Sequence, residues 1–179
     1  MLSIACMLLL GGKLWGDAAG PMAQQQQTSR MLAPGQPAPN FVAATLDGQE
    51  MTLQAYRGRP VIINFWATWC EPCRREMPAF QAVYESYKDV GLMILAVSQD
   101  VQSATEAVRA YVTTMGLPFP PLLDPDGVVA TQYSIIVLPS TVFVSPDGTI
   151  AAMHIGPMTH TQMERYVVAI LPHQDKRHR

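Results

Sequence analysis

The sequence predicts an α/β fold in which a central mixed β-sheet is flanked by helices. Two apolar runs rich in β-forming residues, 61–66 and 92–97, are each followed by a segment with helical spacing. Strand–helix–strand steps of this kind imply parallel pairing. A Ser-Pro-Asp-Gly turn at 145–148 joins two later strand candidates and forms an antiparallel hairpin. We therefore expect parallel and antiparallel pairs in one sheet, with helices on both faces.

The N-terminal half begins with a β-hairpin over 41–46 and 51–53, which is closed by an Asp-Gly turn. The run 61–66 is apolar almost throughout, as in a buried central strand. Residues 70–89 place apolar side chains on one face at helical spacing. Pro78 lies inside this helix and is expected to kink it.

The C-terminal half alternates in the same way between apolar runs and helical patterns. Gly and Pro residues separate its elements. The expected elements are a strand at 92–97, a helix at 102–115, a short helix at 128–133, strands at 140–144 and 149–155, and a helix at 161–171.

The chain ends differ in composition from the middle. The first ten residues are almost all apolar, but a helix needs about 20 such residues to span a bilayer. We expect a signal peptide or membrane-anchor segment at 1–20, a Gln-rich linker at 21–34, a folded domain at 35–172 and a polar tail at 173–179.

Composition and charge narrow the function classes. Of the 179 residues, 49% are hydrophobic and 15% are charged, as in an ordinary globular protein. The net charge of -2, without a basic cluster interleaved with aromatics, argues against nucleic acid binding. Three cysteines are too few for a disulfide scaffold, and no second Cys or His pair completes a zinc site. We expect neither a metal nor another cofactor.

The chemistry is expected at Cys70 and Cys73, a C-x-x-C pair between a strand and a helix. At a helix N-terminus, free N–H groups and the dipole stabilise a Cys70 thiolate. Pro72 suits the first turn because it has no N–H to satisfy. Cys70 would attack a substrate disulfide, and Cys73, one helical turn later, would resolve the mixed disulfide.

The active-site segment FWATWCEPCRREMP at 65–78 resembles that of thioredoxin-like proteins of the TlpA/ResA type. The similarity also includes Tyr133, the Leu-Pro-Ser-Thr step at 138–141, the turn at 146–148 and the Gly-Pro-Met-Thr segment at 156–159. It extends over about 34–171 and implies a thioredoxin-like fold with a central insertion.

The resemblance also implies a function. Members of this family are exported or membrane-tethered reductases, and several reduce the haem-attachment cysteines of apocytochrome c. We therefore expect an extracytoplasmic protein-disulfide reductase. Its partners would be an oxidised protein substrate, such as apocytochrome c, and a membrane thiol that donates electrons. A monomer is the default expectation.

Further site residues follow from the resemblance. Pro139 matches the family's cis-proline, so that the Leu138 backbone would offer hydrogen bonds to an extended substrate peptide. Glu76 matches a functional acid and shares a helix face with Cys73, where it would shuttle protons. The alternative for Glu76 is a solvated surface position. Thioredoxin has its buried acid on the preceding strand, where this chain has Asn64.

Two residues of the motif are expected to face partners. Trp69 would shield the dithiol and offer an apolar docking face, whereas Trp66 could equally belong to the core. Glu71, between the cysteines, should be exposed and tune the reduction potential and partner choice. Val137 stands where the family often has Gly, and we expect it to reshape the substrate groove.

Three other functions compete with the reductase. A dithiol oxidase or isomerase would use the same motif, because the motif does not set the direction of electron flow. A peroxidase would want a Thr three residues before the first cysteine, and Ala67 is there. A Cu(I) chaperone on the same fold would use the thiolates as soft ligands, but its cysteines would be further apart.

Overall fold

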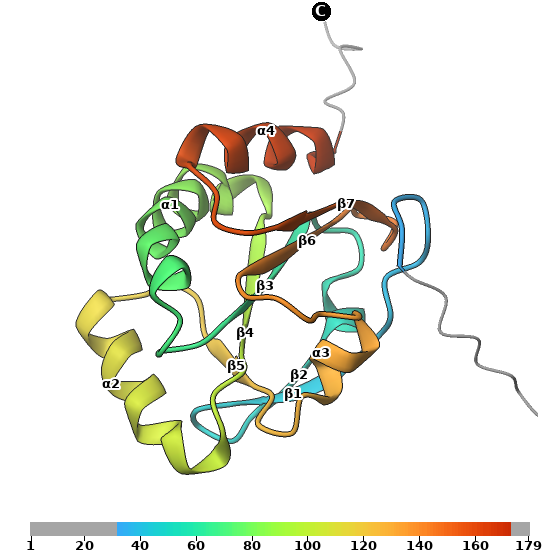
Figure 1. Ribbon diagram of the computed structural model, residues 1–179. Coiled ribbons are helices and arrows are strands. Elements are labelled where there is room, and N and C mark those ends of the chain that lie inside the picture. Colours follow the sequence, from blue (N-terminus) through green and yellow to red (C-terminus); the bar gives the residue numbers. More distant parts are fainter. Residues whose placement is uncertain (1–31, 173–179) are drawn as a thin grey trace, which may run out of the picture. The chain divides into compact units, whose positions relative to one another are not determined.

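The computed structural model describes residues 32–172 as an α/β domain (Figure 1). Short 3-10 turns lie at Leu53–Tyr56, Lys88–Val90 and Gln102–Ala104. The strands and helices are, in chain order, β1 (Val42–Thr45), β2 (Glu50–Thr52), β3 (Val61–Trp66), α1 (Glu71–Tyr87), β4 (Met93–Ser98), α2 (Thr105–Met115), β5 (Pro121–Leu123), α3 (Val128–Gln132), β6 (Ser140–Val144), β7 (Ile150–Ile155) and α4 (His160–Ile170).

One seven-stranded sheet forms the centre, in the order β2-β1-β5-β4-β3-β6-β7. The pairs β3–β4 and β4–β5 are parallel, and β3 pairs with β6 in the antiparallel direction. The mixed sheet is thus confirmed. β3 therefore lies inside the sheet, between a parallel and an antiparallel neighbour, and the dithiol segment begins directly after it.

Two apolar cores cover the two faces of the sheet, because side chains alternate along each strand. In β3, Ile62 and Trp66 belong to the core that contains residues of α1, α2 and α4. Ile63 and Phe65 point the opposite way, into the core that contains residues of α3. The expectation of helices on both faces is confirmed. Asn64 is the polar position on the α1 face of this buried strand.

Strand β5 was not expected from the sequence. Two consecutive prolines argue against a strand in its interior, but Pro121 is the first residue of β5, where a missing N–H is tolerated. β5 pairs with β4 on one side and with β1 on the other. It therefore joins the N-terminal hairpin to the main sheet.

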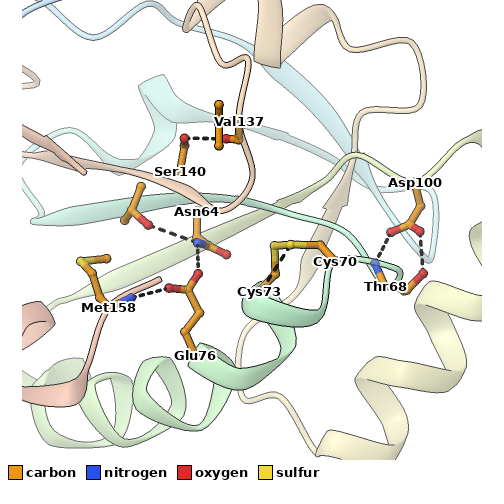
Figure 2. The surroundings of a disulfide bond; sticks show 10 residues. Asn64, Thr68, Cys70, Cys73, Glu76, Asp100, Val137, Ser140 and Met158 are labelled. Carbon is orange, nitrogen blue, oxygen red and sulfur yellow. Dashed lines mark hydrogen bonds between the residues drawn. A yellow bond between two sulfur atoms is a disulfide. The ribbon is translucent and has the colours of Figure 1, made fainter. Parts of the chain in front are cut away.

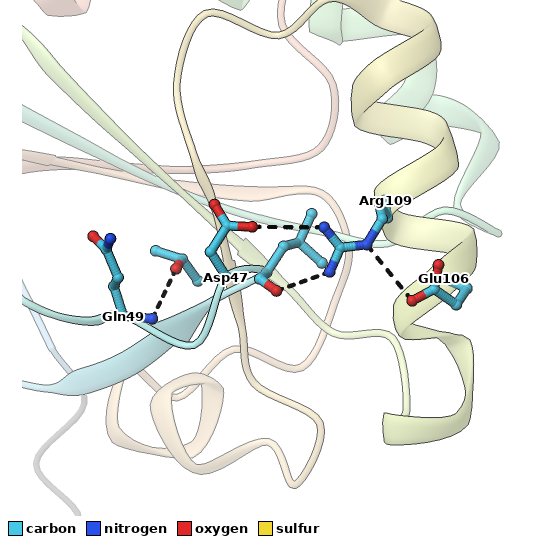
Figure 3. A network of polar contacts seen from close by, with 6 residues as sticks. Asp47, Gln49, Glu106 and Arg109 are labelled. Carbon is cyan, nitrogen blue, oxygen red and sulfur yellow. Dashed lines mark hydrogen bonds and ion pairs between the residues drawn. The ribbon is translucent and has the colours of Figure 1, made fainter.

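The hairpin turn is also tied to α2 (Figure 3). Arg109 donates from Nη2 to the Leu46 carbonyl over 2.9 Å, and it lies 3.6 Å from carboxylate oxygens of both Asp47 and Glu106. Since these carboxylates are exposed, the ion pairs themselves contribute little. The carbonyl contact fixes the hairpin against the helix.

The other expected elements are present with ends shifted by a few residues. The helix expected at 70–89 is α1, which continues through Pro78 and is followed by a 3-10 turn. The segment expected at 1–20, most of the linker at 21–34 and the tail at 173–179 lie outside the described residues. Within residues 32–172, no helix is long and apolar enough to cross a membrane.

Candidate functional site

Cys70 and Cys73 form a disulfide where β3 leads into α1, and their Cα atoms are 5.3 Å apart (Figure 2). Cys70 is the N-cap of α1, and its Sγ accepts a hydrogen bond from the Cys73 N–H over 3.3 Å. Cys70 is 5% exposed, whereas Cys73 is fully buried. A helix N-terminus stabilises negative charge on the capping sulfur. The arrangement favours Cys70 as the attacking sulfur and Cys73 as the resolving one.

The turn before Cys70 is held by Asp100, which follows β4 and is buried. Its carboxylate accepts from the Thr68 N–H over 2.9 Å and from the Thr68 hydroxyl over 2.6 Å. Ser98 adds a third hydrogen bond from Oγ, over 2.8 Å. Figure 2 shows Asp100 and Thr68 on the Cys70 side of the disulfide.

Asp100 was not among the expected site residues. The sequence did contain a signal that places Asp100 near the site, because the carboxyl ends of neighbouring parallel strands lie at the same edge of a sheet. Asp100 follows β4 as Thr68 follows β3. The sequence could not show that the two side chains meet.

Glu76 is buried, and the surface alternative is wrong for this side chain. Oε1 accepts from Asn64 Nδ2 over 3.1 Å, and Oε2 accepts from the Met158 N–H over 3.0 Å. Burial raises the pKa of Glu76 to about 7, although both hydrogen bonds act in the opposite direction. A carboxyl with this pKa can both take and give a proton near neutral pH.

The peptide bond between Leu138 and Pro139 is cis, as expected. Pro139 is buried, and its carbonyl accepts from the Gly156 N–H over 2.9 Å. Within residues 32–172, Leu138 is half-buried and forms no backbone hydrogen bond of its own. Its N–H and C=O are therefore unpaired within the described residues, and their use by a substrate stays a prediction.

The remaining motif residues lie at the surface or in the core. Trp69 is 70% exposed, and Glu71 is exposed and pairs with Arg75. Pro72 lies in the first turn of α1 and is half-buried. Trp66 is fully buried and belongs to the core.

An apolar pocket of about 230 Å³ lies beside the cis-proline loop. Val137 and Ile136 line it from the loop, and Met153 and Ile155 line it from β7. Val137 is 47% exposed, and its carbonyl accepts from the Ser140 hydroxyl over 2.7 Å. The side chain that replaces the frequent Gly thus adds apolar surface next to Pro139.

The sequence is similar to those of several known proteins. The AhpC/TSA family matches residues 34–153. The thiol-disulfide oxidoreductase ResA of Geobacillus kaustophilus is 38% identical over 141 residues, which cover 79% of this chain and 80% of the relative. The thioredoxin-like protein YneN of Bacillus subtilis is 38% identical over 131 residues, covering 73% and 76%.

Among solved structures, a secreted Mycobacterium tuberculosis disulfide oxidoreductase, described as homologous to Escherichia coli DsbE, superposes with a TM-score of 0.65. It shares 26% sequence identity, and the match covers 72% of this chain and 95% of that chain. The thioredoxin-like fold expected from the active-site segment is therefore confirmed.

Proposed function

This chain belongs to the AhpC/TSA family and is a thiol–disulfide oxidoreductase, and we propose that it reduces protein disulfides outside the cytoplasm. The observation that carries the proposal is the pair of sulfurs at the start of α1, because Cys70 keeps a small exposed fraction whereas Cys73 is fully buried. Their asymmetry fits a two-step exchange in which the outer sulfur meets the substrate.

In the first step, the Cys70 thiolate attacks a substrate disulfide, one substrate sulfur leaves as a thiolate, and a mixed disulfide forms. In the second step, the buried Cys73 attacks Cys70 and the second substrate sulfur leaves. The Glu76 carboxylate takes the proton that Cys73 loses. A pKa of about 7 supports this role, because the group is then partly ionised at neutral pH.

The substrate is proposed to be an extended segment of an oxidised protein. The unpaired Leu138 backbone would bind the segment as an added strand, and Pro139 would place it against the dithiol. Trp69, Glu71 and Pro72 would line the approach from α1. The haem-attachment cysteines of apocytochrome c are the substrate that the TlpA/ResA resemblance implies.

Two observations support the choice of compartment. The apolar first ten residues fit a signal peptide or anchor, and one similar solved structure is described as secreted. Outside the cytoplasm the enzyme needs electrons from across the membrane, and a membrane thiol carrier is the proposed donor.

The deciding experiment measures the reduction potential of the full chain carrying Cys6→Ser, with Cys70→Ser as the inactive control. A value below roughly -230 mV, in the thioredoxin direction, would support a reductase. A value above roughly -180 mV would overturn this direction in favour of an oxidase or isomerase. Reduction of oxidised haem-attachment peptides would then test the substrate.

A further inference from the structure

Asn64 has a buried acceptor atom without a donor. The side chain is 1% exposed, and its Nδ2 is fully used: it donates to Glu76 Oε1 over 3.1 Å and to Thr141 Oγ1 over 3.2 Å. Oδ1 has no hydrogen-bond partner within the described part of the chain. Buried acceptors are rarely left in this state, and each such case requires an explanation.

In Figure 2, Oδ1 of Asn64 lies on the side of the amide that is nearer to the disulfide in this view. Cys73 lies one helical turn before Glu76, on the same face of α1, and Asn64 binds Glu76 on that face. A disulfide sulfur has no hydrogen to donate, whereas a thiol has one. Reduction therefore gives this site a donor that the disulfide lacks.

We propose that Asn64 is the hydrogen-bond acceptor of the Cys73 thiol in the reduced enzyme. The amide would then bridge the two groups, accepting from Cys73 through Oδ1 and donating to Glu76 through Nδ2. The inference rests on the dithiol chemistry, but not on the direction of electron flow or on the substrate proposed above.

A dithiol reductant supplies two electrons and two protons and is itself oxidised to a disulfide, while the Cys70–Cys73 bond breaks and both sulfurs become thiols. The new Cys73 S–H satisfies Oδ1. Asn64 therefore favours the reduced state, because its oxygen is bonded to the thiol there and is unpaired in the disulfide.

The test is the Asn64→Leu variant of the full chain, in a Cys6→Ser background. Leucine has a similar size but no acceptor, so the dithiol equilibrium should move at least tenfold toward the disulfide, which lowers the reduction potential by about 30 mV. Thr141→Val is the matched control, because it removes the Thr141 hydroxyl that accepts from Asn64 Nδ2 and leaves Oδ1 in place. It should change the dithiol equilibrium less than threefold. An unchanged potential in Asn64→Leu would overturn the proposal.

Two further measurements separate this effect from other causes. Repeating Asn64→Leu in a Glu76→Gln background should give the same shift, whereas loss of the shift would assign it to the carboxylate. In the Cys6→Ser, Cys70→Ser chain with Asn64 intact, the infrared S–H band of Cys73 should lie below that of the unfolded chain. A band at the position found in the unfolded chain would contradict the hydrogen bond between Cys73 and Asn64. This test needs no substitution at residue 64.

Discussion

Asp100 accepts hydrogen bonds from both the backbone N–H and the hydroxyl of Thr68, so that one buried carboxylate fixes the turn two residues before Cys70. The contact joins the ends of two parallel strands, β3 and β4, at the edge of the sheet where the dithiol lies. The position of the attacking sulfur thus depends on a residue 30 positions away in the chain.

The Asp100→Asn variant should lose about 1–3 kcal/mol in free energy of unfolding, because an amide has one acceptor oxygen and leaves a buried donor unpaired. Urea unfolding of the oxidised protein measures this loss. Asp126→Asn is the control, since Asp126 is exposed and its replacement should change stability by less than about 0.5 kcal/mol. Equal stability of the two variants would show that the Asp100 contacts contribute nothing.

Glu76 should make stability fall as the pH rises. Its pKa is raised from 4.5 to about 7 in the folded protein, so that between these values the folded state keeps a proton that the unfolded state has released. This contribution is fully present below pH 4.5 and is lost as the pH passes 7. Urea unfolding of the parent and of Glu76→Gln from pH 4 to 8 tests it. The difference between the two should depend on pH in this range, and parallel profiles would refute the raised pKa.

The Cys73→Ser variant should accumulate a mixed disulfide through Cys70, because the resolving sulfur is absent. Non-reducing electrophoresis and mass spectrometry with an oxidised protein substrate would detect the adduct, in a Cys6→Ser background that leaves one thiol. Cys70→Ser should form far less adduct, since Cys73 is fully buried. Equal trapping by both variants would contradict the assigned order of attack.

Trp69→Ala should separate substrate docking from thiol chemistry. Trp69 is 70% exposed, so its removal should change stability by less than about 0.5 kcal/mol. A protein disulfide should show a raised KM, whereas the rate with a small aromatic disulfide should stay within about threefold. Losses of similar size with both substrates would mean that Trp69 acts on the dithiol itself rather than on docking.

Periodicity and turn residues were sufficient for most of the fold. The continuous apolar run of β3, the helical face of α1 and the Asp-Gly turns are local signals, and the elements they predict are present. Strand β5 was missed because Pro120 and Pro121 signal a break, whereas its pairing with β1 and β4 is a long-range property.

For the site, the sequence by itself determined the dithiol and its helix, because both depend on residues close together in the chain. The cis bond at Pro139 came from the resemblance, since a single X–Pro step has little local preference for cis. Only the tertiary structure decided that Glu76 is buried against Asn64 and Met158, and that Asp100 holds Thr68. These contacts join separate segments, and the burial that perturbs a carboxyl group exists only once the segments have packed together.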